Sequence, residues 1–83
     1  MLSLNEVRLL TSRISNEADI QILLTEIRIL ESYCHRQLLL ADRNALSSIR
    51  LQHWLFTMIS VRDVINAPAT LRQRVALIKE ILK

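Results

Sequence analysis

The most reactive side chains in this sequence are Cys34 and His35, which are direct neighbours. A thiolate next to an imidazole is the pairing that many cysteine nucleophiles use. On a helix, however, adjacent side chains point about 100° apart and do not face each other. Cys34 also falls on an apolar stripe, where a free cysteine usually acts as a small hydrophobic residue. We therefore interpret Cys34 as a core residue, and we do not expect an enzyme.

A metal site would have to be built from the two histidines, His35 and His53, with Glu31 nearby. Structural zinc sites use four Cys, His or carboxylate ligands, and this set supplies three. The sequence contains no glycine, so it has no glycine-rich loop that could cradle a phosphate. We expect no metal, no cofactor and no small-molecule substrate.

The charged residues raise the possibility of a nucleic-acid contact. The net charge is +3, and residues 42–83 carry seven Arg or Lys against three acidic residues. Arg72, Gln73 and Arg74 lie near the start of a predicted helix, where Arg and Gln side chains could reach base edges, and Lys79 follows one to two turns later. A charge of +3 is low for a protein that binds duplexes by neutralising phosphates. Nucleic-acid binding through these four residues is therefore the alternative function.

Glu26 and Glu31 do not form a pair suited to acid and base catalysis. They are five residues apart, which places them on different rows of a helix. We expect these carboxylates to pair with Arg28, Arg36 or the basic second half of the chain.

The composition predicts helices. Hydrophobic residues make up 51% of the 83 residues, and the chain has no glycine and one proline. Tight β-hairpins usually need Gly, Asn-Gly or Asp-Gly turns, which are missing. The length corresponds to a single domain, residues 1–83. One cysteine cannot form an internal disulfide, which favours a reducing cytoplasm, and we expect neither a signal peptide nor a transmembrane helix.

Four helices are predicted, at about 4–14, 17–40, 44–66 and 68–83. Helix-capping signals lie at Ser3 with Glu6, at Ser15 or Asn16, and at Thr70 with Gln73. No Gly or Pro interrupts residues 16–66, so one long helix is a second possibility. The turn residues Asp42 to Asn44 favour a hairpin at 41–44. We expect an all-α fold: a small antiparallel helical bundle of three to four helices around a central hairpin.

The second helix is apolar over most of its circumference, which indicates neighbours on more than one side. One stripe runs from Ile20 to Leu38 and is predicted to be the internal core. The other stripe, with an edge of the third helix, is predicted to be a protein interface made of Ile22, Ile29, Tyr33, Leu40, Trp54, Met58 and Val61.

The large apolar content of so short a chain implies that some Leu and Ile side chains reach the surface. Exposed apolar patches of a few hundred Å² usually mark interaction sites. The sequence therefore predicts a protein-protein interaction module, namely an adaptor, a chaperone-like protein or an assembly subunit. Its partner would be another protein or a second copy of the chain, as a heterodimer or homodimer.

Overall fold

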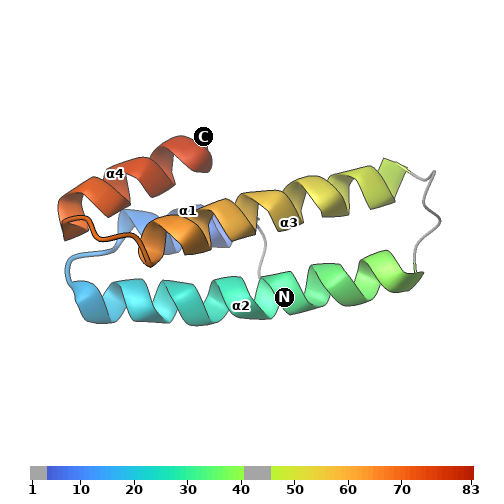
Figure 1. Cartoon of the computed structure of the whole chain (residues 1–83), viewed down its shortest axis with the longest axis horizontal. Helices are drawn as coiled ribbons and strands as arrows, with labels where there is room; N and C mark the ends of the chain where they lie inside the picture. The colour runs from blue at the N-terminus through green and yellow to red at the C-terminus, as the bar shows by residue number, and fades with distance from the viewer. Residues whose placement is uncertain (1–3, 41–45) are drawn as a thin grey trace.

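The computed structural model describes residues 4–40 and 46–83, and the helices in these ranges form an all-α bundle (Figure 1). The helices are α1 (Leu4–Ser12), α2 (Glu17–Leu40), α3 (Leu46–Ile65) and α4 (Leu71–Ile81). The predicted fold class and the predicted order of helices are confirmed. The predicted ends differ by at most three residues, the largest difference being the later start of α4.

α2 and α3 lie side by side and run in opposite directions, so they form a helical hairpin (Figure 1). The possibility of a single helix over residues 16–66 is therefore wrong. The predicted turn at 41–44 lies outside the described residues.

Side-chain caps fix where two of the helices begin. The Asn16 side chain accepts a hydrogen bond from the Asp19 backbone N–H at 2.9 Å, which caps α2. At α4, the Thr70 hydroxyl accepts from the Gln73 N–H, and the Gln73 side chain accepts from the Thr70 N–H, both at 3.1 Å. This capping box starts α4 at Leu71 rather than at Pro68. The predicted cap at Ser3 lies outside the described residues.

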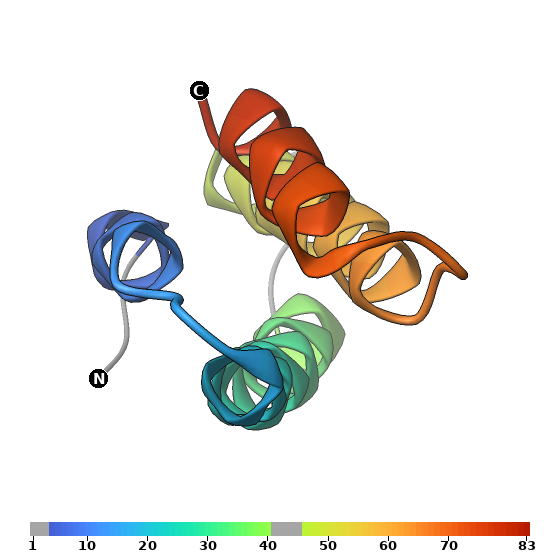
Figure 2. The same ribbon diagram turned by 90° about the vertical axis from the view of Figure 1, so that its left-hand side faces the viewer.

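The four helices differ greatly in length, and this determines the shape of the molecule. α2 and α3 have 24 and 20 residues, whereas α1 and α4 have 9 and 11. At a rise of about 1.5 Å per residue, the short helices can cover only about half of the hairpin. They lie over its end near residues 17 and 65 (Figures 1 and 2). We call this end, with α1 and α4, the proximal bundle, and residues 33–40 and 46–54 the distal hairpin.

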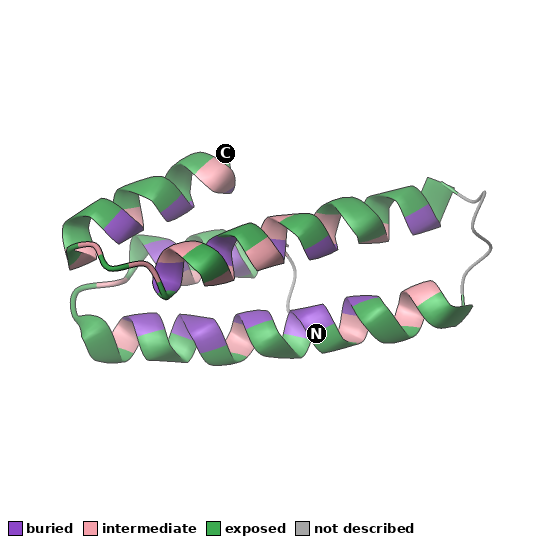
Figure 3. Ribbon diagram, viewed as in Figure 1, coloured by how far each residue is buried: buried purple, intermediate pink, exposed green. Residues whose placement is uncertain are grey.

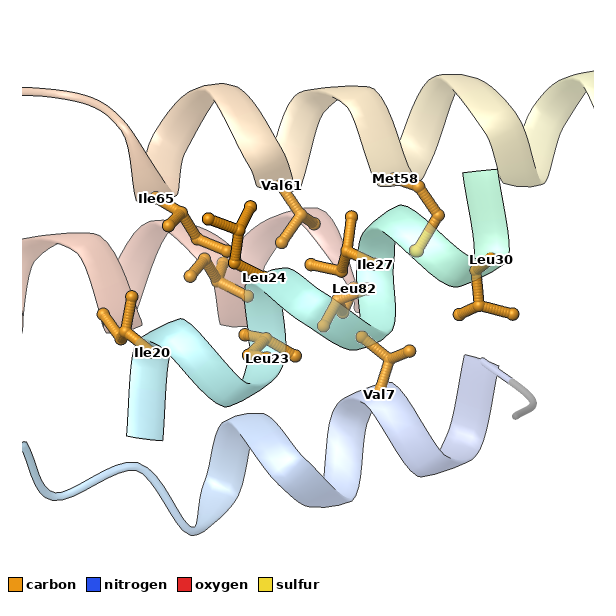
Figure 4. Close-up of a cluster of buried hydrophobic side chains, with 11 residues drawn as sticks. Val7, Ile20, Leu23, Leu24, Ile27, Leu30, Met58, Val61, Ile65 and Leu82 are labelled. Carbon is orange, nitrogen blue, oxygen red and sulfur yellow. The ribbon is translucent and has the colours of Figure 1, made fainter. Parts of the chain in front are cut away.

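The hydrophobic core lies in the proximal bundle (Figure 4). All four helices contribute to it, for example through Val7 of α1, Ile27 of α2, Val61 of α3 and Ile78 of α4, each of which is fully buried. The stripe predicted to be core is buried from Ile20 to Cys34, and only its last residue, Leu38, remains partly exposed.

Polar side chains hold the proximal helices together. The buried Arg74 of α4 donates to the backbone carbonyls of Ala69 at 3.0 Å and Ile65 at 3.2 Å, and it pairs with Glu17 of α2. Arg8 of α1 donates to the Leu82 carbonyl at the end of α4. These contacts satisfy carbonyl groups that helix ends otherwise leave without partners.

A further ion pair crosses the hairpin between Arg62 of α3 and the largely buried Glu31 of α2, at 2.6 Å. This pairing with the basic second half is one of those expected for Glu31. The other carboxylate oxygen of Glu31 is buried and has no partner within the described part of the chain.

Candidate protein interface

The distal hairpin is the part of the molecule that the other described helices leave largely uncovered, since α1 reaches only its beginning, through Leu4. Only Cys34 and Ser48 are buried among its residues, and the ribbon is largely exposed there (Figure 3). Several large apolar side chains are therefore open to solvent. Leu39 is 85% exposed and Leu40 is 82% exposed, and the others are Leu46 and Ile49.

The total surface agrees with this uneven coverage. The chain exposes 5610 Å², whereas the usual scaling for a folded protein of 9.7 kDa gives about 5,100 Å². The molecule is elongated, with extents of 40 × 20 × 20 Å. A surface about one tenth larger than the scaling gives is in line with an elongated molecule in which one end of the bundle consists of two helices.

An open groove of about 470 Å³ runs between α2 and α3 in the distal hairpin. Its wall is mainly apolar, with a few polar groups and a single charged side chain. We call it the distal groove, and its lining residues are Tyr33, Gln37, Leu46, Ser47, Arg50, Leu51 and Trp54.

Trp54 connects the distal groove to the face that α1 covers. It lines the groove, and it also lines a small gap beneath Leu4, at the start of α1, that is too tight for a water molecule. Leu30, Cys34 and Met58 complete that gap. The distal groove is therefore the continuation, beyond the start of α1, of the hairpin face on which α1 packs.

The structure separates the seven residues of the predicted interface into three groups. Tyr33 and Trp54 line the distal groove, and Leu40 is exposed at the end of α2. Ile22 and Ile29 are more than half exposed, but they lie on α2 in the proximal bundle.

The other two residues of the prediction, Met58 and Val61, are placed differently from what the sequence suggested. They are 2% and 0% exposed and belong to the hydrophobic core (Figure 4). Val61 is covered within the chain, where the core also includes Ile78 and Leu82 of the last helix. Neither side chain is available on the surface of this chain.

Sequence reasoning missed most of the distal groove, above all Leu46, Arg50 and Leu51. Helical periodicity identifies apolar faces but does not say which part of each face the neighbouring helices will cover. The signal that could have found them is the difference in length between the long central helices and the short flanking helices. Short flanking helices must leave one end of a long hairpin bare.

The candidate nucleic-acid contacts are also divided. Gln73 serves as the partner in the capping box of α4, and Arg74 is buried with three partners inside the chain. Both side chains therefore already have partners within the chain. Arg72 and Lys79 are exposed and line a depression between α4 and the connection from α1 to α2, together with Ile14, Ser15, Leu71, Val75 and Ala76.

Cys34 is fully buried, and burial raises the pKa of its thiol, with a further rise from the negative charge of Glu31. Its neighbour His35 is exposed, so the two side chains lie in different environments. Within residues 4–40 and 46–83, no three His, Cys, Asp or Glu side chains are grouped so that they could hold a metal ion. In the same ranges, none of the helices is long and apolar enough to cross a membrane.

We compared the chain with protein-family models, curated proteins and solved structures, and none of them matches it.

Proposed function

We propose that this protein is a protein-interaction module, an adaptor or assembly subunit that receives a helix of another protein in its distal groove. One observation carries the proposal: the distal groove is apolar, and no described helix of the chain covers it. A single cysteine, buried as a free thiol, fits a module that works in a reducing cytoplasm.

The proximal bundle supports a helix as the occupant. There the hairpin completes its core by packing against α1 and α4, with Leu4 seated near Trp54 and Met58. The distal hairpin offers the same kind of surface, two antiparallel helices with apolar side chains between them. A helix that presents apolar residues at i, i+3, i+4 and i+7 fits such a groove, as in other helix-in-groove complexes.

The nucleic-acid alternative is less well supported. Two of its four candidate residues, Gln73 and Arg74, already have partners within the chain. Arg72 and Lys79 alone would neutralise few phosphates, and affinity for duplexes depends mainly on that neutralisation.

The proposal is tested by adding a synthetic amphipathic helix to ¹⁵N-labelled protein and following the backbone amide signals. The peptide carries Leu and Ile on one face and only Gln and Ser on the other, so that charge plays no part. We expect the signals of the distal groove to shift and those of the proximal bundle to remain in place.

Two exposed leucines provide matched variants for this titration. Leu46 lines the groove and is 63% exposed, whereas Leu77 lies on α4 and is 50% exposed. Leu46→Asp should weaken binding at least about tenfold, because a charge in an apolar contact is costly to desolvate. Leu77→Asp should bind as the wild type does. Shifts that spread over the proximal bundle, or equal binding by both variants, would contradict the proposal.

A further inference from the structure

The distal hairpin has an unbalanced charge, which bears on the chemistry of its partner. From Ser32 to Ser60 the sequence contains three arginines, Arg36, Arg43 and Arg50, and one acidic residue, Asp42. The charges of Arg43 and Asp42 are opposite and sum to zero. Both residues lie outside the described residues. The described part of the distal hairpin thus carries two positive charges and no carboxylate.

Arg50 is the charged side chain in the wall of the distal groove. Arg50 is exposed. The ion pairs within the described residues are formed by Arg62, Arg74 and Lys83, and none of them includes Arg50. A guanidinium presents a planar set of donors that matches a carboxylate in a bidentate manner. Gln37 and Ser47 in the same wall add groups that can form hydrogen bonds at the edge of an apolar contact.

We infer that the partner of the distal groove is an acidic amphipathic helix, with Asp or Glu residues flanking its apolar face and one of them paired with Arg50. This inference rests on the proposed function. The groove lining runs from Tyr33 to Gln37 on α2 and from Leu46 to Trp54 on α3. At about 1.5 Å per residue, the longer wall accommodates about two turns of the partner.

The same charges argue against a second copy as the occupant. In a symmetric dimer the same patch faces itself, so two copies of the groove wall would bring together two Arg50 side chains and no carboxylate among the lining residues. Like charges brought together at an interface oppose association and exclude wrong partners. An acidic helix meets no such repulsion.

The test compares three synthetic helices that share one Leu and Ile face and differ only in the flanking residues, which are Glu, Gln or Lys. Trp54 is the only tryptophan and lines the groove, so its fluorescence reports binding of peptides that lack tryptophan. The Glu helix should bind about fivefold more tightly than the Gln helix at low salt, and the Lys helix should bind most weakly. Added salt should reduce these differences.

Matched charge variants locate the effect. Arg50→Gln should bring the affinities of the Glu and Gln helices together, whereas Arg72→Gln, which removes an exposed cation of α4, should leave the preference unchanged. If the Gln helix binds in the groove as tightly as the Glu helix, the acidic partner is ruled out while the proposed function stands. If none of the helices alters Trp54 fluorescence, the proposed function itself fails.

Two other occupants are separate outcomes of the same experiment. A dimer of the chain in light scattering, abolished by Leu46→Asp, would overturn the inference in favour of a second copy. A Trp54 response to phosphatidylglycerol vesicles but not to the Glu helix would overturn it in favour of a membrane surface. A monomer that responds to the Glu helix and not to vesicles supports it.

Discussion

The two ends of the α2 and α3 hairpin have a similar fraction of apolar residues, about half in each, but different surroundings. In the proximal bundle, α1 and α4 cover the hairpin, and residues such as Ile20, Ile27 and Ile65 are buried. In the distal hairpin, Leu39, Leu40 and Leu46 are exposed. The comparison teaches that the number of apolar residues does not decide burial here. The length of the neighbouring helices does.

The ion pairs and side-chain hydrogen bonds between helices also differ between the proximal bundle and the distal hairpin. Arg74 and Arg8 tie α4 and α1 to their neighbours, and the pair of Arg62 with Glu31 joins α2 to α3 within the proximal part of the hairpin. Arg50 lines a groove and takes part in none of the ion pairs found within the described residues. The proximal bundle thus contains the buried core and most of the tying polar contacts, and the distal hairpin is the part at which we propose that a partner binds.

The largest effect is expected from a pair of substitutions two residues apart on α2. Ile27→Asp places a carboxylate in the fully buried core and should unfold the chain. Ile29 is 53% exposed, so Ile29→Asp should change the free energy of unfolding by less than about 1 kcal/mol. Circular dichroism with urea denaturation measures both. Unfolding by both variants would mean that the second stripe of α2 also faces inward.

Arg74 should contribute more to stability than Arg72, although both are arginines on the first turn of α4. Arg74→Ala leaves the carbonyls of Ile65 and Ala69 without their donor and should cost about 1–3 kcal/mol. Arg72→Ala changes an exposed side chain and should cost less than about 0.5 kcal/mol. The midpoints of urea unfolding compare them, and equal losses would contradict the roles assigned here.

Replacing the exposed leucines at the end of α2 should leave the fold intact. Leu39→Gln combined with Leu40→Gln removes apolar groups that are already in water, so the free energy of unfolding should change by less than about 0.5 kcal/mol. Solubility should rise, because exposed apolar patches promote association. A loss of several kcal/mol in urea denaturation would show that these leucines are covered within the chain.

The smallest effect is confined to acidic pH. Hydrogen bonds from the backbone and the hydroxyl of Ser15 lower the pKa of Asp19, with a further contribution from the Asn16 backbone. A lowered pKa in the folded state means that this contribution to stability is present above the pKa of the unfolded chain. It is lost as the pH falls through the folded pKa.

Asp19→Asn should therefore flatten the dependence of unfolding free energy on pH between about pH 5 and pH 2. Ser15→Ala removes the hydroxyl donor and should flatten it less. Urea denaturation at a series of pH values measures the slopes. An unchanged slope in Asp19→Asn would contradict the assigned hydrogen bonds.

Much of the fold could be predicted from the sequence because its signals are local. Asn16 and the pair of Thr70 with Gln73 mark helix starts through short-range hydrogen bonds, and the stripe from Ile20 to Cys34 follows helical periodicity. The position of the distal groove could not be predicted in the same way, because exposure depends on long-range coverage by other helices. Met58 and Val61 lie on an apolar arc like Trp54, but they belong to the core that α1 and α4 complete, whereas Trp54 also lines the open groove.

The most direct test of the binding role of the distal hairpin is amide hydrogen exchange, measured with and without the Glu helix. In the free protein, amides of the distal hairpin should exchange faster than those of residues 20–31, because fewer buried contacts hold them closed. The added helix should slow exchange at 33–40 and 46–54 and leave the proximal bundle unchanged. Equal protection of both ends in the free protein, or slowing confined to α1 and α4, would contradict the account.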